Sequence, residues 1–107
     1  GNCPYGDLYI SAYSADFDKK GNLVIKVQCV NVSGYKVTGL KNLKITVKDA
    51  NGKTVGTYKQ IKKSTTISDG SSKAFTFMIK KSALKKKKID LRNAKISVDG
   101  KYIYLYY

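Results

Sequence analysis

The sequence contains no histidine, no glutamate and no tryptophan, and it has a single proline, a single methionine and a single arginine, Arg92. Without histidine it lacks the usual general base for a serine or cysteine nucleophile and the commonest transition-metal ligand. Seven aspartates are its only acidic side chains, so a glycosidase-like pair of aspartates is the remaining route to carboxylate catalysis. These absences predict a protein that is not an enzyme and that holds no metal or cofactor.

Long apolar runs are also missing. None approaches the ~20 residues that a membrane helix requires, and no signal peptide is visible, so we expect any export signal to lie outside this sequence. A chain of 107 residues buries roughly 65% of its unfolded surface, which suffices for one two-layer core. The sequence predicts one domain over residues 1–107, with residues 1–6 as an extended N-terminal segment.

Positive charge is abundant. Twenty lysines and one arginine against seven aspartates give a net charge of +14, which predicts attraction to polyanions such as nucleic acid, an anionic membrane or anionic wall polymer. Lysine acts as a point charge, whereas base-specific recognition favours the planar guanidinium of arginine. The excess of lysine therefore indicates diffuse attraction and disfavours a nucleic-acid partner.

The central stretch, residues 43–58, predicts a β-hairpin. Leu43, Ile45 and Val47 alternate with Lys44, Thr46 and Lys48, which places the two sets on opposite faces of a strand. A loop at residues 50–52, with Gly52 in a bulge, brings Val47 opposite Val55, whereas a two-residue Asn-Gly loop would bring Ile45 opposite Tyr58. The first register is preferred because it keeps both valines in the core.

The rest of the chain also reads as strands. Alternation predicts strands at 7–17, 23–32 and 75–79, with turns at 18–22 and 68–72, and residues 37–40 lead into the central hairpin. A helical turn is expected after Ser82, and a last hairpin is expected to join 94–98 to 101–107 through Asp99-Gly100. About seven antiparallel strands at this spacing predict an all-β sandwich.

The two cysteines, Cys3 and Cys29, leave a disulfide open, as a secreted domain would allow. A hairpin through residues 18–22 places Ser11 opposite Cys29, and Cys3 then lies about 25 Å further along the strand. This favours Cys29 as a small buried hydrophobe and a free Cys3. Lipid attachment at Cys3 is a further alternative, against which Asn2 argues.

Two groups of residues are candidate binding sites. A basic group is a candidate polyanion site, with a solvated loop as the alternative: Lys62, Lys63, Lys80, Lys81, Lys85, Lys86, Lys87 and Lys88. An aromatic group on the last hairpin is a candidate glycan or partner face, with plain cross-strand packing as the alternative: Lys95, Tyr102, Tyr104 and Tyr106.

The middle of the chain resembles the bacterial surface-layer assembly (SLAP) domain and, more loosely, FxLYD-type surface modules. The resemblance covers residues 22–91 and rests on Asn31, on the hairpin at 49–55 and on the segments 22–24, 68–77 and 87–91. It implies an immunoglobulin-like sandwich on the surface of a Gram-positive bacterium, without catalytic residues.

The combined prediction is a non-catalytic, extracellular or cell-surface module that associates with anionic cell-wall polymer or with a protein neighbour. Two alternatives use the same features. A nucleic-acid-binding protein would use the lysines together with tyrosine stacking, although no recognisable nucleic-acid-binding motif accompanies them. A purely structural spacer domain would carry its charge for solubility alone.

Overall fold

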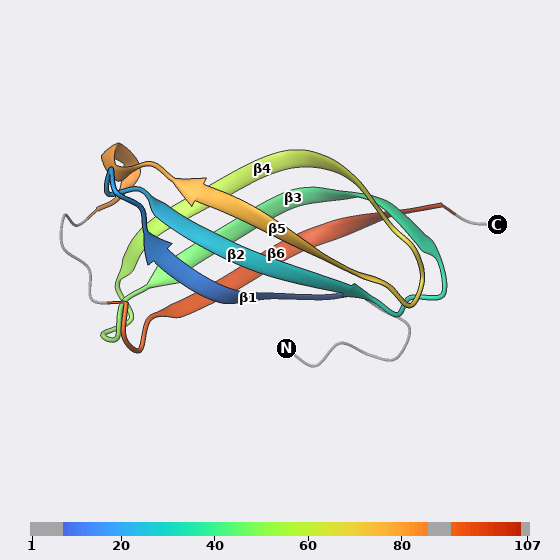
Figure 1. The fold of residues 1–107 in the computed structure, drawn as a ribbon, viewed down its shortest axis with the longest axis horizontal. Helices are drawn as coiled ribbons and strands as arrows, with labels where there is room; N and C mark the ends of the chain where they lie inside the picture. The colour runs from blue at the N-terminus through green and yellow to red at the C-terminus, as the bar shows by residue number, and fades with distance from the viewer. Residues whose placement is uncertain (1–7, 86–90, 106–107) are drawn as a thin grey trace.

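Six strands in two sheets form the fold (Figure 1). The computed structural model describes the backbone of residues 8–85 and 91–105 and the side chains of residues 8–85 and 91–100. The predicted N-terminal segment, residues 1–6, and Cys3 within it lie outside the described residues. The strands are β1 (Leu8–Phe17), β2 (Leu23–Asn31), β3 (Lys36–Lys48), β4 (Thr54–Ile67), β5 (Ser72–Ile79) and β6 (Lys95–Leu105).

The strand order is that of an immunoglobulin-type sandwich. One sheet has the order β1-β2-β5 and the other β4-β3-β6, and every neighbouring pair is antiparallel. These orders correspond to strands A-B-E and C′-C-F of immunoglobulin domains. The predicted all-β sandwich is confirmed, with six strands in the described residues instead of about seven.

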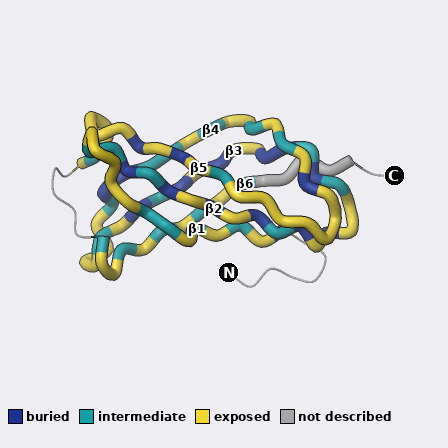
Figure 2. The backbone as a smooth tube through the Cα atoms, viewed as in Figure 1, coloured by how far each residue is buried: buried dark blue, intermediate teal, exposed yellow. Residues whose placement is uncertain are grey.

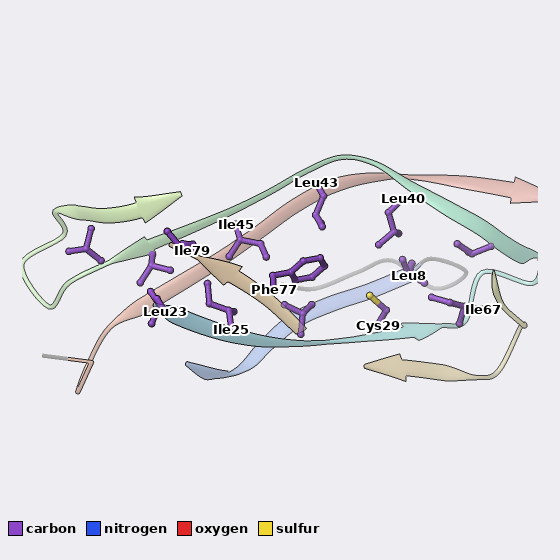
Figure 3. Packing of buried hydrophobic residues seen from close by; sticks show 14 residues of the cluster. Leu8, Leu23, Ile25, Cys29, Leu40, Leu43, Ile45, Ile67, Phe77 and Ile79 are labelled. Atoms are coloured by element: carbon purple, nitrogen blue, oxygen red, sulfur yellow. The ribbon is translucent and has the colours of Figure 1, made fainter. Parts of the chain in front are cut away.

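The core lies between the two sheets, where the inward-facing residues of both meet (Figures 2 and 3). Strand β2 alternates buried and more exposed positions along its whole length, as its sequence predicts. Fully burying one leucine or isoleucine stabilises the fold by roughly 1.5–3 kcal/mol. The buried hydrophobic residues are Leu8, Leu23, Ile25, Val27, Cys29, Val37, Leu40, Leu43, Ile45, Val47, Val55, Ile67, Phe77 and Ile79.

Helical structure in the described part of the chain is limited to a single 3₁₀ turn, η1 (Lys81–Ala83). It contains Ser82, whereas the sequence predicts a turn after that residue. Within the described ranges, no helix is both long enough and apolar enough to cross a membrane.

A β-bulge interrupts β1 at Tyr13. Ala12 and Ala15 both pack against the core, although residues three apart face opposite sides of a regular strand. The pairing of β1 with β2 shifts by one residue between Ala12 and Ser14. The extra residue turns Ala12 and Ala15 to the same side of the sheet. Tyr13, at the shift, is left 58% exposed.

This bulge changes the pairing of Cys29. The predicted turn at 18–22 is present, held by hydrogen bonds to the Asp18 carboxylate from the backbone N–H groups of Lys20 and Asn22. Beyond the bulge, however, Ile10 lies opposite Cys29. The predicted pairing of Ser11 with Cys29 is therefore wrong, because a regular strand was assumed. Cys29 itself is buried with a free thiol, as predicted.

The central hairpin forms with the expected turn and an unexpected bulge. Gly52 has a positive φ of 81°, and Lys48 lies opposite Thr54, as the three-residue loop requires. The register then shifts, so that Val47 faces Gly56 and not Val55. Beyond the shift, Ile45 lies opposite Tyr58. This is the pairing that a two-residue Asn-Gly loop would have produced.

The second bulge lets β4 bury two consecutive residues. Val55 and Gly56 are both buried, so Val55 reaches the core without facing Val47. A Cβ atom on Gly56 would lie 3.0 Å from Leu84 Cδ2 and 3.1 Å from Ile79 Cδ1. Only glycine fits there without moving these side chains. The predicted Val47–Val55 pairing is wrong for this reason, although both valines are buried as expected.

Strand β6 runs straight through Asp99-Gly100. The predicted hairpin at this dipeptide is wrong, because β6 pairs with β3 along both of its halves. The irregularity lies instead in β3, where the pairing shifts between Lys41 and Lys44. Asn42, within that shift, has a positive φ of 52°. One continuous strand therefore replaces two and accounts for the lower strand count.

A buried asparagine joins two of the three connections that cross between the sheets. The Asn31 side chain is fully buried, and its Nδ2 donates to the carbonyl oxygens of Tyr35 and Ile67, each at 2.8 Å. Its Oδ1 accepts from the backbone N–H of Ser33 at 3.0 Å and from the Ser33 hydroxyl at 2.6 Å. The β2–β3 and β4–β5 connections are thereby held together at one end of the sandwich (Figure 1).

The first testable consequence concerns Asn31. Asn31→Asp keeps the size of the side chain but places a carboxylate oxygen against the two carbonyls that Nδ2 now serves. We expect the free energy of unfolding to fall by about 3 kcal/mol, since buried polar groups lose their partners. Urea denaturation measures this. Asn51→Asp, in an exposed turn, is the control, and an equal effect of both changes would contradict the proposed role.

A second prediction concerns Cys29. Burial raises the pKa of its thiol from 9.0 to about 11. In a Cys3→Ser background, a disulfide reagent should therefore modify Cys29 slowly at mildly alkaline pH and rapidly in denaturant. Because the folded state keeps the proton, the contribution of this thiol to stability is complete below pH 9.0 and is lost as the pH approaches about 11. Rapid modification of the native protein would show that the site is open.

Candidate functional site

The outer face of the β4-β3-β6 sheet carries six of the sixteen lysines whose side chains the structure describes, more than the outer face of the other sheet. On β3, Lys44 and Lys48 alternate with buried Ile45 and Val47, so the lysines project away from the core. Each of these two lysines, like Lys41 earlier in β3, has a lysine directly opposite it, on β4 or on β6. We call these six exposed residues the lysine face: Lys41, Lys44, Lys48, Lys59, Lys62 and Lys95.

These lysines are paired directly across the strands. Lys44 lies opposite Lys59, and Lys41 lies opposite Lys62. Side chains that face each other in this way have Cβ atoms only about 4.5–5.5 Å apart, and like charges at that distance are destabilising. In the described part of the chain, the one acidic residue aligned with them is Asp99, opposite Lys44 on β6.

A third opposed pair extends the lysine face towards the other end of the sheet. Lys48 lies opposite Lys95 on β6, four residues and about 13 Å from Lys44 along β3. Between them is a row of hydroxyl side chains, in which Thr46 is flanked by Thr57 and Ser97. The face is therefore a strip of positive charge with small polar residues between its lysine pairs.

The opposite face of the sandwich is chemically different. The residues of the β1-β2-β5 sheet that alternate with the core include two charged side chains, Asp16 and Lys26, which offset each other. The remainder are neutral and mostly small: Tyr9, Ser11 and Ser14 on β1, Val24, Gln28 and Val30 on β2, and Ser72, Ala74, Thr76 and Met78 on β5. Positive charge is thus concentrated on one sheet.

The structure divides the predicted basic group. Lys62 belongs to the lysine face, but Lys63 is partly buried on the inner side of β4. The Lys63 Nζ atom lies 5.1 Å from the centre of the Phe75 ring and 5.5 Å from that of Phe77. These cation–π contacts cover the edge of the core, so Lys63 has a structural role.

The remaining predicted lysines lie near the opposite end of the sandwich. The Lys81 N–H donates to Asn22 Oδ1 at 3.0 Å, next to Lys80, and the Lys85 N–H donates to the Val55 carbonyl at 3.0 Å. Lys62 follows Val55 by seven residues, about 23 Å along β4. The structure therefore does not bring Lys62 and Lys63 together with this group. Lys86, Lys87 and Lys88 lie outside the described residues.

The predicted aromatic face depended on the hairpin that does not form. In the continuous strand β6, Tyr102 is paired with Leu40 and Tyr104 with Val37, whereas Lys95 is paired with Lys48. The turn that grouped Lys95 with these tyrosines is absent, and the side chains of Tyr102 and Tyr104 lie outside the described ones. Tyr106 lies outside the described residues. A glycan-binding role for the tyrosines stays a prediction.

Sequence reasoning missed most of the lysine face. The alternation of residues 43–48 already placed Lys44 and Lys48 on an outer face, but they were not selected as site residues. Lys59 was missed because the strand was followed only to Tyr58, whereas β4 extends to Ile67. A lysine-rich continuation after Tyr58 was the signal that would have revealed the opposed pairs.

The chemistry available at this site is electrostatic attraction and hydrogen bonding. Among the described residues, no group of three or more histidine, cysteine, aspartate or glutamate side chains is arranged to hold a metal ion. The free thiol of Cys29 is buried in the core, on the inner side of the other sheet. The lysine face is therefore suited to bind an anionic partner.

The opposed lysines generate a prediction about stability. Lys59→Glu turns the Lys44–Lys59 repulsion into attraction, so the free energy of unfolding should rise by up to about 1 kcal/mol at low salt. Added salt should reduce the gain. The control is Lys26→Glu, because Lys26 lies opposite Ser14 and Thr76. Urea denaturation measures the free energy of unfolding of both variants. An equal increase in both would show that the lower net charge is responsible and that the Lys44–Lys59 repulsion is not.

Comparison with known proteins identifies a family. The model of the SLAP domain family matches residues 4–100, which is most of the chain and includes all of the described part of the sandwich up to Gly100. No curated protein matches the sequence. The resemblance predicted from the sequence is confirmed, and the chain belongs to the SLAP domain family of non-catalytic, surface-associated modules.

Proposed function

We propose that this domain is a binding module on the extracellular surface of a Gram-positive bacterium, where its lysine face associates with anionic cell-wall polymer. The observation that carries the proposal is the direct opposition of Lys41 with Lys62, Lys44 with Lys59 and Lys48 with Lys95. The membership of the chain in a surface-associated family supports this location.

Repulsion within the lysine pairs is relieved when a polyanion binds. Opposed lysines cost stability in the free domain, although Asp99, on the other side of Lys44, offsets part of the cost of the Lys44–Lys59 pair. An anionic group placed between two opposed ammonium groups neutralises both. A polymer with regularly repeated charges would engage several pairs at once and release the counterions that the free lysines retain. The arrangement therefore favours an extended polyanion over a single small anion.

A nucleic acid fits this face less well than a wall polymer does. The chain has a single arginine, and Arg92 is not among the residues of the lysine face. The described residues on the outer side of this sheet include no aromatic side chain that would stack on a base. Lysine ammonium groups, which act as point charges, suit a flexible polymer whose phosphates are not held in a fixed geometry.

The test compares charge reversal on and off the lysine face. The face variant carries Lys44→Glu, Lys59→Glu and Lys62→Glu, and the matched variant carries Lys19→Glu, Lys26→Glu and Lys73→Glu. Each set lowers the net charge from +14 by the same amount. We expect the face variant to bind purified Gram-positive cell wall at least ~10-fold more weakly than the matched variant does, a difference of about 1.4 kcal/mol.

Three further measurements decide the interpretation. Binding is compared on walls with and without their anionic polymer, on duplex DNA and on an acidic protein, each over a salt series. Equal losses in the two triple variants, or equal binding to wall and DNA, would reduce the interaction to general charge attraction. Reversal of Lys85, Lys86, Lys87 and Lys88 tests the basic run predicted from the sequence. A loss of binding confined to that variant would overturn the assignment of the lysine face.

A further inference from the structure

A hollow in the outer surface lies between two of the opposed lysine pairs. Its volume is about 200 Å³, and it is lined by residues of β3 and β4: Asn42, Leu43, Lys44, Lys59, Gln60 and Ile61. The Lys44–Lys59 pair forms one side, and the Lys41–Lys62 pair follows next along both strands. Asn42 and Ile61 occupy the interval between the two pairs.

The backbone is irregular at this hollow. Asn42 adopts a positive φ of 52°, and β3 contains two residues, Asn42 and Leu43, where β6 contains only Gly100. Two residues opposite one are the signature of a β-bulge, which bends the strand locally. The bulge therefore lies beside the hollow, whose lining residues include Asn42 together with Lys44 and Lys59.

Its lining combines three kinds of group. Ile61 is 83% exposed, the most exposed large hydrophobic side chain of the described residues, and it lies among lysines. The Asn42 amide is exposed and available to hydrogen-bond a ligand. The Gln60 amide is held in place, since its Oε1 accepts from the Tyr58 hydroxyl at 2.9 Å and its Nε2 donates to the Lys62 carbonyl at 3.1 Å.

We propose that this hollow binds one phosphate-bearing polyol or sugar unit of the polymer, an inference that rests on the proposed function of the lysine face. Lys44 and Lys59 contact the phosphate, Asn42 hydrogen-bonds a hydroxyl group, and Ile61 packs against the carbon chain. A volume of about 200 Å³ exceeds the roughly 10–15 Å³ that one water requires on the same measure, so the hollow admits a group larger than a single water. An inorganic anion would leave Asn42 and Ile61 without a contact.

The experiment uses amide chemical shifts of the isotopically labelled protein to compare three probes: glycerol 3-phosphate, inorganic phosphate and glycerol. We expect glycerol 3-phosphate to bind about 10-fold more tightly than inorganic phosphate and to shift the amide signals of residues 41–44 and 59–62. Glycerol alone should bind more weakly than either. Equal affinity for glycerol 3-phosphate and inorganic phosphate would overturn the inference.

Two pairs of variants assign the contacts. Ile61→Ser is compared with Met78→Ser, an exposed apolar residue on the other sheet. Asn42→Gly is compared with Asn93→Gly, because both asparagines have a positive φ that glycine accepts, 52° and 62°. Ile61→Ser and Asn42→Gly should each reduce the preference for glycerol 3-phosphate over inorganic phosphate, while the two controls should not. Identical behaviour within either pair would contradict the assigned contact.

Polymer binding separates this inference from the proposed function. If walls bind through the lysine face but glycerol 3-phosphate shows no preference for the hollow, the inference fails and the proposed function stands. If neither the wall polymer nor glycerol 3-phosphate binds, both fail. Urea denaturation of each variant shows that it is folded, and the high exposure of Ile61 and Asn42 predicts unchanged stability.

Discussion

The buried amide of Asn31 is the interaction on which the two-sheet arrangement depends. The chain crosses from one sheet to the other after β2 and returns after β4, and both crossings lie at the same end of the sandwich. Asn31 binds the carbonyls of Tyr35 and Ile67 across these crossings, and its backbone N–H donates to Ser71. Since buried polar groups are almost always hydrogen-bonded, these bonds tie the two connections to one another at that end of the sandwich.

Alternation along the chain predicted the strands well, and the register only partly. Period-two patterns are local, so β2 and β5 follow directly from the residue types. The bulges at Tyr13 and Val55 depend on tertiary packing. Each allows two residues to be buried that a regular strand would place on opposite sides. No local signal distinguishes Val55 as a bulge position, because the need for it arises from Leu84 and Ile79. The same limit hid the opposed lysines, which become visible only when the register of three strands is known.

The unequal charge of the two outer faces reconciles stability with function. A net charge of +14 opposes compaction by self-repulsion, and directly opposed lysines add to it. The core offsets this cost, since fourteen of the described hydrophobic residues are buried between the sheets, while the second sheet has an outer face with little net charge. Repulsion is thereby confined to side chains that extend into solvent, where water and counterions screen it.

The failure of the Asp99-Gly100 turn is linked to the bulge that lies beside the hollow. Asp-Gly favours a tight turn when nothing competes with it, but here β3 offers a continuous line of backbone partners on both sides of the dipeptide. Pairing along the whole of β6 requires β3 to absorb an extra residue, and Asn42 does so in a left-handed conformation that asparagine tolerates. Asn42 is also one of the residues that line the hollow between the lysine pairs. The departure from local preference therefore lies at the candidate binding site, where a fold is expected to give up local consistency for function.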